Sequence, residues 1–286
     1  MDEGKLRTEM RGAAAMLVVG VFALNAHAQE AMWAEAATQP PSQTLRYRPM
    51  AHYVRYGGSP SGKFTRAEEL SIEHEFAFAL KPDVSLSVTV PTTYRTTKGR
   101  TGGDATDEDS GIGDITALAK IRWYKDDTGP IDTVRSSIFF GAEIPSGHEQ
   151  LSSKSVDPIV GVATTWIRKR WGGTFTVGYK MNTNQEEEGL EPGDAKADAF
   201  NIDNAVMYRL APEKFTMESK GAWYLIGEVN GIFETNADHE VMLSPGLMYE
   251  GWTWAFEASI QLPILQQVDH RPERRFVVGL GLRFLF

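Results

Sequence analysis

Acidic side chains alternate with apolar ones in the segment 69–80 (ELSIEHEFAFAL). Successive side chains of a strand point to opposite faces, so Glu73 and Glu75 share one face. Ile72 and Phe76 share the other face. A helix would spread the carboxylates around its circumference, so the period of two favours a strand. On the inner face of a closed sheet, charged groups can pair with each other, or they can line a route whose polarity selects a solute.

Charged side chains fall on the corresponding face of other apolar stretches. We predict that this face lines an interior, and the candidate lumen-lining residues are Glu73, Glu75, Lys120, Arg122, Glu143, Arg168, Arg170, Lys180, Asp203, Arg209, Glu228 and Glu257. Both signs of charge occur, so ion pairs that brace a narrow interior are one interpretation and a selective route is the other. Arg168 and Arg170 lie two positions apart and could attract an anion, or they could anchor the adjacent turn.

Residue types used in catalysis are present without the spacing that catalysis needs. Ser146 precedes His148 by two residues, but both lie in a turn marked by Pro-Ser-Gly, and His74 lies on an apolar strand face. The sequence contains no G-x-S-x-G elbow and no H-E-x-x-H pair. It also has no cysteine, which excludes thiol nucleophiles, disulfides and thiolate metal sites. We expect no enzyme activity, no catalytic residue, no cofactor and no metal site; an outer-membrane lipid hydrolase is the alternative.

Two acidic stretches are predicted to be loops, near 97–110 and 183–197. Their carboxylates are Asp104, Asp107, Glu108 and Asp109 in the first and Glu186, Glu187, Glu188, Glu191 and Asp194 in the second. Such oxygen ligands could bind calcium or magnesium that also bridges lipopolysaccharide phosphates. The spacing does not match an EF-hand loop, so we favour solvated, self-repelling loops.

The net charge of the chain excludes one class of partner. The formal net charge is −9 at pH 7. Nucleic-acid binding depends on Lys and Arg side chains that neutralise phosphates, so we expect no nucleic-acid partner.

Period-two stretches recur along the chain and predict about twelve strands, each near the length that spans a bilayer. They lie near 44–56, 69–80, 84–90, 112–124, 132–145, 157–171, 174–182, 198–210, 221–234, 241–250, 252–263 and 275–286. The connections alternate in length. Mostly short ones lie near 81–83, 125–131, 172–173, 211–219 and 251, and mostly longer ones lie near 57–66, 97–110, 146–156, 183–197, 235–240 and 264–274. An up-and-down outer-membrane barrel needs this asymmetry, whereas a soluble sandwich or lipocalin-like barrel does not.

Aromatic residues gather near the predicted periplasmic strand ends, where a membrane–water boundary favours them. They are Trp123, Tyr124, Trp171, Trp223, Tyr224, Trp252, Trp254, Phe284 and Phe286. The final stretch, RFVVGLGLRFLF, places Phe and Leu side chains on one face of a strand. Gly281, Phe284 and Phe286 resemble the signal that outer-membrane barrels present to the barrel-assembly machinery, so we expect that machinery as a partner.

The first residues resemble an export signal. An apolar run from Ala13 to Ala26 follows Arg11 and ends in a small-x-small site. We expect residues 1–28 to be a signal peptide cleaved after Ala28, with translation starting at Met1 or Met10. Residues 29–43 then form a flexible lead-in, which either hangs in the periplasm or plugs the interior, and residues 44–286 form the barrel.

Several short segments resemble an outer-membrane transporter-like family named for a meta-pathway of phenol degradation. They include SGIGDI at 110–115, EIPSG at 143–147, VGY at 177–179, GEVNG at 227–231, LSPGL at 243–247, QLP at 261–263 and RFVVG at 275–279. The resemblance covers roughly residues 70–286. It implies a barrel of the Gram-negative outer membrane that moves small, often aromatic or hydrophobic, molecules, and it assigns no functional residue.

The residues and the resemblance together predict an all-β, transmembrane, antiparallel up-and-down β-barrel preceded by a cleaved signal peptide. We expect passive or facilitated passage of a small-molecule solute, in contact with outer-membrane lipid and lipopolysaccharide. The alternative is a largely closed barrel with a surface-binding or envelope-structural role.

Overall fold

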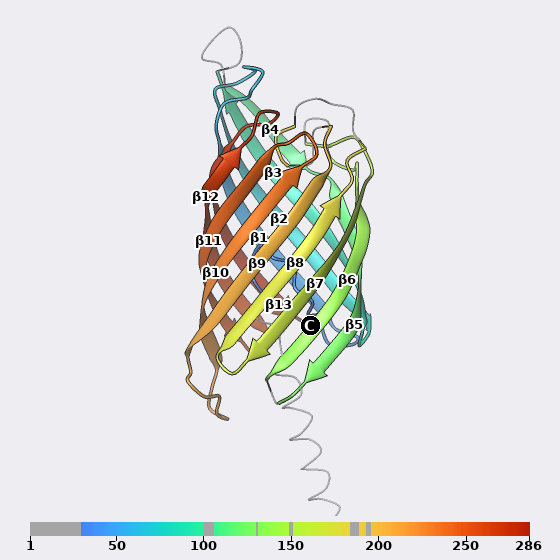
Figure 1. The fold of residues 1–286 in the computed structure, drawn as a ribbon, viewed down its shortest axis with the longest axis vertical. Helices are drawn as coiled ribbons and strands as arrows, with labels where there is room; N and C mark the ends of the chain where they lie inside the picture. Colours follow the sequence, from blue (N-terminus) through green and yellow to red (C-terminus); the bar gives the residue numbers. More distant parts are fainter. Residues whose placement is uncertain (1–29, 100–105, 130, 149–150, 184–188, 193–195) are drawn as a thin grey trace, which may run out of the picture.

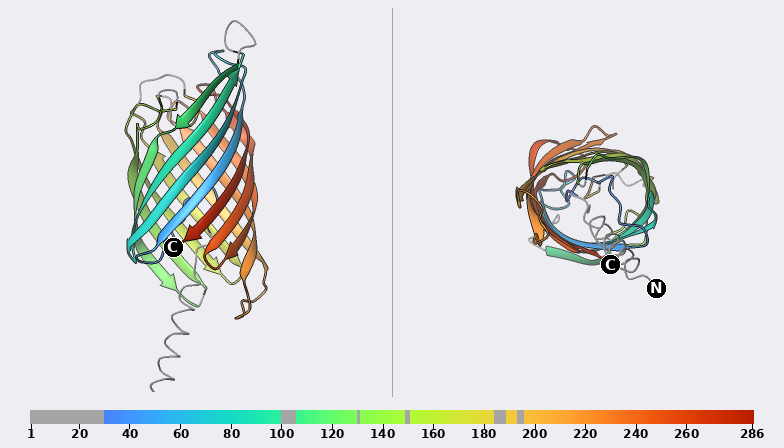
Figure 2. Two further views of the ribbon diagram at one scale, coloured as in Figure 1. Left: turned by 180° about the vertical axis from the view of Figure 1, so that it is seen from behind. Right: turned by 90° about the horizontal axis from the view of Figure 1, so that it is seen from below.

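The computed structural model describes residues 30–99, 106–129, 131–148, 151–183, 189–192 and 196–286, and it is a closed antiparallel β-barrel (Figures 1 and 2). The strands are β1 Leu45–Tyr56, β2 Arg66–Lys81, β3 Val84–Lys98, β4 Thr106–Ile112, β5 Ile115–Asp127, β6 Thr133–Ile144, β7 Asp157–Arg168, β8 Trp171–Lys180, β9 Ala199–Ala211, β10 Gly221–Glu234, β11 His239–Gly251, β12 Trp254–Gln267 and β13 Arg274–Leu285. In the described residues, no helix is long and apolar enough to cross a membrane.

The first and last strands close the barrel. In β1, Tyr53 lies opposite Leu70 of β2 on one side and Val278 of β13 on the other. One strand is interrupted, because β3 pairs with β5 through Val84–Thr89 and with β4 through Thr92–Lys98. Since β4 and β5 share the place of one strand, the barrel has 12 strands, as the sequence predicts.

Side-chain alternation places apolar residues outside and polar residues inside. On β2, Phe76 and Phe78 are exposed on the outer surface, whereas Glu69 and Ser71 are buried on the inner face. On β13, Val278, Leu280 and Leu282 face outward. A lipid-facing barrel requires this arrangement, and the chain is an outer-membrane β-barrel protein of the Gram-negative type.

The two ends of the barrel have different connections (Figure 1). Tight turns join β2 to β3, β7 to β8 and β11 to β12 at one end. The connection 57–65 and the described residues of the connections 145–156 and 181–198 lie at the other end. The residues 212–220 are a longer connection at the short-turn end. We assign the short-turn end to the periplasm, as in other outer-membrane barrels.

The predicted loop near 97–110 has strand residues at both of its ends. β3 continues to Lys98, and β4 begins at Thr106, so the two form a hairpin that rises above the barrel rim (Figure 2). Arg95 lies opposite Asp109 in this hairpin. Above the rim the hairpin does not face lipid, so its strands need no apolar face. Its sequence is therefore acidic, and from the sequence it is predicted to be a loop. Asp104 lies outside the described residues.

An aromatic girdle surrounds the periplasmic end. Trp223 packs against Tyr249 with ring centroids 5.0 Å apart, and Trp254 lies 5.2 Å from the same Tyr249. Trp171 contacts Tyr208 at 4.7 Å. One predicted girdle residue is wrong: Tyr224 is 2% exposed and lies inside the barrel, because it neighbours the outward Trp223 along the strand.

Candidate functional site

The chain that precedes β1 lies inside the barrel. Residues 30–41, here called the lumen plug, form a loop in the lumen on the periplasmic side (Figure 2, right). Most of its side chains are small: Ala31, Ala34, Ala36 and Ala37 are buried in it. The structure thus places the described part of the predicted lead-in in the interior, which is one of the two alternatives that the sequence leaves open.

Glu228 of β10 holds one side of the lumen plug. Its carboxylate accepts hydrogen bonds from the backbone N–H groups of Met32 at 3.0 Å, Trp33 at 3.2 Å and Ala34 at 3.0 Å. Three successive N–H groups around one carboxylate resemble the backbone concavities that bind anions. Glu228 is 1% exposed, so these bonds satisfy a fully buried charge.

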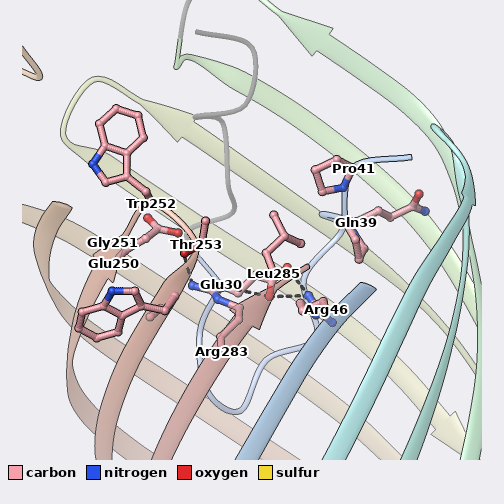
Figure 3. A pocket seen from close by; sticks show the side chains of 13 residues that line it. Glu30, Gln39, Pro41, Arg46, Glu250, Gly251, Trp252, Thr253, Arg283 and Leu285 are labelled. Atoms are coloured by element: carbon pink, nitrogen blue, oxygen red, sulfur yellow. Dashed lines mark hydrogen bonds and ion pairs between the residues drawn. The ribbon is translucent and has the colours of Figure 1, made fainter. Parts of the chain in front are cut away.

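Glu30 joins the lumen plug to the closing seam of the barrel (Figure 3). Its carboxylate accepts a hydrogen bond from Arg46 of β1 at 2.6 Å and from Arg283 of β13 at 2.9 Å. The Thr38 hydroxyl donates to the same carboxylate at 2.6 Å and closes the loop of the plug. Charge-assisted bonds of this kind are the stronger class of hydrogen bond.

The opposite wall holds the lumen plug through its carbonyl groups. Lys120 of β5 donates to the Ala36 carbonyl at 2.7 Å, and Ser137 of β6 donates to the Ala37 carbonyl at 2.8 Å. The Ala37 N–H donates to Thr165 of β7 at 3.0 Å, and Thr176 of β8 donates to the plug at 2.6 Å. The plug backbone is therefore hydrogen-bonded on both sides of the lumen.

A cavity of about 320 Å³, here called the chamber, lies on the inner wall next to the lumen plug. The chamber is lined by Met32, Trp33, Ala34, Glu35, Arg48, Met50, His52, Val54, Tyr56, Glu69, Ser71, Glu73, Glu75, Ser87, Thr89, Leu118, Glu191, Pro192, Gln261, Arg274 and Val277. The residues 32–35 belong to the plug, and Glu191 and Pro192 belong to the extracellular connection between β8 and β9. The chamber is thus bordered by the plug and by a surface loop.

One of the apolar clusters of the lumen lies beside the chamber. Val54, Tyr56, Ala67, Met242 and Val277 form it, and they come from four different strands. Three partly buried residues from the plug and the extracellular connections pack against this cluster: Trp33, Phe64 and Leu190. The interior therefore offers both charged groups and an apolar surface at the same level.

The predicted lumen-lining residues fall into groups in the structure. Glu73 and Glu75 line the chamber. Lys120 and Glu228 contact the lumen plug, and Glu257 pairs with Arg48 at 2.9 Å.

Other candidates lie elsewhere in the lumen. Lys180 pairs with Glu143 at 2.9 Å, and Asp203 accepts a hydrogen bond from Asn230 at 3.0 Å. Near the periplasmic end, Arg122 pairs with Asp83 at 2.7 Å.

Arg209 also lies near the periplasmic end, where its guanidinium stands over the Phe215 ring at 4.3 Å. No single site gathers all of these candidates.

Arg168 and Arg170 do not form the predicted inward pair. Arg168 is exposed and shares the outer face of β7 with Val162 and Trp166. Arg170 lies in the turn after β7 and donates to the Arg209 carbonyl at 2.9 Å. The inward prediction is wrong for both, because the even-numbered residues of β7, Arg168 included, form its outer face and Arg170 lies beyond the end of the strand. The turn-anchoring alternative describes Arg170.

Several site residues were not named as candidates from the sequence. On β1, Arg46, Arg48 and His52 face inward, and their alternation with Tyr47 and Tyr53 was the available signal. The residues of the lumen plug had no such signal, because no repeat or motif marks a segment that packs inside a barrel.

A carboxylate at the strand interruption holds the extracellular connection 145–156. Asp114, between β4 and β5, accepts hydrogen bonds from the N–H groups of Gly147 at 2.9 Å and Ser153 at 2.7 Å. Burial alone would raise the pKa of Asp114, but these bonds outweigh it and lower the pKa below the ordinary 3.8. Asp114 is therefore an ionised latch for this loop.

The predicted assembly-signal residues lie at the seam. Gly281 faces inward beside Glu257, and Phe284 faces outward with its ring 6.4 Å from Tyr47. The Phe286 N–H donates to the Leu45 carbonyl at 2.9 Å. Their role in assembly stays a prediction.

Ser146 and His148 perform structural tasks in the loop. The Ser146 hydroxyl accepts a hydrogen bond from the Ile115 N–H at 2.9 Å and donates to the Ile144 carbonyl at 3.2 Å. The His148 N–H donates to the Ile112 carbonyl at 2.8 Å. Within the described ranges, no group of three or more His, Cys, Asp or Glu side chains is placed to hold a metal ion. Glu186–Glu188 and Asp194 of the acidic loop lie outside those ranges.

Known proteins share this architecture. The structure is similar to an outer membrane channel from Pseudomonas putida F1, with a TM-score of 0.59, 9% identity and coverage of 91% of this chain and 100% of that chain. It is less similar to the beta domain of the Bordetella autotransporter BrkA, with a TM-score of 0.46, 10% identity and coverage of 86% and 100%. At 9% identity the likeness to the channel shows the fold. No curated protein matches the sequence.

One family model matches residues 68–286, which is more than half of the chain. The matched region includes the strand interruption, Asp114 and Glu228. The chain belongs to the family described as "Putative MetA-pathway of phenol degradation".

Proposed function

We propose that this outer-membrane barrel passes a small molecule with an aromatic or apolar body, and that passage requires movement of the lumen plug. The observation that carries the proposal is the chamber, which adjoins the apolar cluster of Val54, Tyr56 and Val277 inside the lumen. Apolar side chains on the inner face favour contact with a solute that has an apolar body. The outer membrane channel of similar fold supports a channel role.

The plug is suited to movement because the contacts that hold its backbone are polar and replaceable. Hydrogen bonds and ion pairs hold it at Glu228, Arg46 and Lys120, and water can take over each of them. Small alanine side chains leave few interlocking contacts that would resist displacement. We infer that the resting barrel is plugged and that the passing state has a displaced plug.

The second candidate is a closed barrel with an envelope-structural or surface-binding role. The bonds that hold the plug from Glu228, Glu30 and the β5–β8 wall favour it, because a permanently fixed plug would look the same. We propose no enzyme activity, since the Ser146 hydroxyl is engaged in holding the loop backbone at Ile115 and Ile144.

Solute flux into liposomes separates these candidates. Full-length processed protein is reconstituted with entrapped buffer, and uptake is measured for arabinose, benzenesulfonate and benzyltrimethylammonium, which do not cross lipid. We expect uptake of an aromatic probe to exceed that in protein-free liposomes and to rise when residues 30–39 are deleted. A folded barrel that admits no probe with or without these residues would refute the channel and support the envelope role.

We also propose partners for the outer surface. The exposed apolar bands of β2 and β13 contact outer-membrane lipid, and the extracellular rim contacts lipopolysaccharide. The terminal strand with Phe284 and Phe286 is proposed as the segment that the barrel-assembly machinery recognises.

A further inference from the structure

We propose that the chamber is a binding subsite for an organic cation, a protonated amine attached to an aromatic or apolar body. The inference rests on the proposed function, because it names the class of solute that would pause in the lumen. It is carried by the charge of the chamber wall, by one unpartnered ring nitrogen and by the aromatic residues beside them.

Acidic groups outnumber basic groups on the chamber wall. The lining carboxylates are Glu35, Glu69, Glu73, Glu75 and Glu191, and the lining guanidinium groups are Arg48 and Arg274. Both guanidinium groups are already engaged, Arg48 by Glu257 at 2.9 Å and Arg274 by Glu240. The two lining guanidinium groups thus have carboxylate partners outside the chamber lining.

Three of the five carboxylates have permanently charged partners behind the wall. Glu69 pairs with Arg95 at 2.7 Å, Glu75 pairs with Arg46 at 2.6 Å, and Glu35 pairs with Lys120. Each of these three carboxylates is neutralised by its partner, so none of them needs a ligand to balance its charge.

Glu73 and Glu191 differ from the other carboxylates. Glu73 contacts the His52 ring at 3.2 Å, and a histidine carries charge only when protonated. Glu191 reaches Arg95 at 3.9 Å, a guanidinium that Glu69 already holds more closely. The charge of Glu69 raises the pKa of Glu191 to about 8, so Glu191 is largely protonated at pH 7 and Glu73 supplies the charge of the site. The Glu73 and Glu191 side chains are 33% and 49% exposed, so a solute in the chamber can reach them.

The His52 ring provides an independent indication. Its Nδ1 lies 3.2 Å from the Glu73 carboxylate, which can only accept, so Nδ1 carries the proton in the neutral ring. The Nε2 atom is then an acceptor, and it is buried without a hydrogen-bond partner. An unpartnered acceptor beside a carboxylate fits a ligand that donates several N–H bonds, which an ammonium group does.

The surroundings of His52 fit the body of such a ligand. The Trp33 ring lies 4.7 Å from the His52 ring, centroid to centroid, and Met50, Val54 and Val277 line the same chamber. An aromatic face attracts a cation and also packs against an apolar body. A cavity of about 320 Å³ has room for a single-ring amine.

A metal ion fits less well. Metal binding needs at least three ligand groups converging on one point. In the part of the chain that the structure describes, no cluster of three His, Cys, Asp or Glu side chains meets that requirement. The negative charge is spread along the wall, which suits a cation with its own apolar body.

Equilibrium binding to the whole protein in detergent tests the proposal at pH 7. The probes are 2-phenylethylamine, the neutral 2-phenylethanol and the anion phenylacetate. The signal is the fluorescence of Trp33. The other six of the seven tryptophans are exposed on the protein surface, so a change on ligand binding inside the lumen is assigned to Trp33. Loss of the change in Trp33→Phe identifies it. The variants are Glu73→Gln and, as a control, Asp203→Asn, a lumen carboxyl outside the chamber lining.

We expect the amine to bind at least about fivefold more tightly than the alcohol, and Glu73→Gln to abolish that preference. Asp203→Asn should keep the preference, and phenylacetate should bind most weakly. Equal binding of amine and alcohol by the wild type, or a preference that survives Glu73→Gln, overturns the proposal. Because binding is measured without transport, a failure here is distinct from a failure of liposome flux, which tests the channel.

Discussion

The Ala34 N–H donates to Oε2 of Glu228 at 3.0 Å, across 194 residues of sequence. The Met32 and Trp33 N–H groups converge on the same carboxylate. A peptide segment inside a barrel belongs to no sheet, so its backbone groups must find partners among side chains or water. Glu228 supplies these partners on one wall of the lumen.

Replacement of Glu228 by Gln should loosen the lumen plug. An amide has one acceptor oxygen and no charge, and hydrogen bonds to a charged group are worth about 1.5–3 kcal/mol each. We expect faster uptake of benzenesulfonate by Glu228→Gln liposomes and faster proteolysis of residues 30–41. Asp203→Asn is the matched control, since it neutralises a lumen carboxyl that does not touch the plug. If Glu228→Gln liposomes take up benzenesulfonate at the wild-type rate, the contact of Glu228 with the plug does not limit passage.

A disulfide should lock the plug reversibly. The chain has no cysteine, and Ala37 of the plug packs in one buried cluster with Ala163 of β7. In the Ala37→Cys/Ala163→Cys variant, oxidation should stop solute uptake and a reductant should restore it. Either single variant serves as the control. Uptake that is unchanged in the fully oxidised double variant would mean that solutes pass without plug movement.

Gly141 of β6 should tolerate no side chain, because a Cβ there would meet the Ala117 carbonyl oxygen at 1.9 Å. Overpacking of this kind costs about 1–3 kcal/mol. We expect Gly141→Ala to lower the urea midpoint of unfolding, whereas Gly227→Ala should not, since a Cβ at Gly227 meets nothing within 4 Å. Equal midpoints for the two variants would contradict the close strand contact.

Asp114→Asn should release the extracellular connection 145–156. The asparagine keeps an acceptor but loses the charge that Gly147 and Ser153 stabilise, at an expected cost of about 2 kcal/mol. Trypsin should cut faster after Lys154, which lies in this loop. Asp126→Asn, at an exposed position, is the control. Unchanged cleavage at Lys154 would argue against the latch.

The contact between Asp238 and His270 should make the extracellular connection 268–273, between β12 and β13, sensitive to pH. Burial alone would raise the pKa of Asp238, but N–H donors of Asp269 and His270 outweigh it and lower the pKa below 3.8. The hydrogen bond from Asp238 raises the pKa of His270 above 6.5. The Asp238 contribution is present above pH 3.8 and is lost as pH falls through its lowered pKa. The His270 contribution is complete below pH 6.5 and is lost as pH rises through its raised pKa.

Asp238 should therefore hold this connection most firmly between pH 3.8 and pH 6.5, where both contributions are present. Amide exchange at Asp269 and His270, corrected for its intrinsic pH dependence, should be about twofold faster at pH 8.5 than at pH 5.5. Asp238→Asn should remove the difference. An exchange rate that does not vary in the wild type would exclude this contact as a loop tether.

The sequence predicts the barrel well because the period of two is a local property. The strand Gly221–Glu234 is predicted with its observed bounds, since outward Val229 and inward Glu228 alternate without interruption. The hairpin of β3 and β4 is missed because its strands pair beyond the membrane, where no apolar face is required. Arg168 is misplaced because the face of β7 that it shares with Val162 and Trp166 points outward and not into the lumen.

The candidate site is less accessible from the sequence. The charges of β1 and β2 follow from alternation, but their partners depend on which strands close the barrel. The lumen plug contacts β1, β5–β8, β10 and β13 at once, and such contacts depend on the three-dimensional shape of the lumen. No local pattern in AMWAEAATQPP encodes them.

Glu30 has a consequence for the order of assembly. Its two arginine partners, Arg46 and Arg283, sit on the strands that meet last when the cylinder is sealed. An open sheet would bring only one of the two arginines to Glu30. The free energy of plug binding and the free energy of barrel closure are therefore coupled. Binding of the lumen plug thereby stabilises the closed barrel that encloses it. In a chain whose β1 and β13 strands have not yet paired, the plug would not be held and the lumen would stay open.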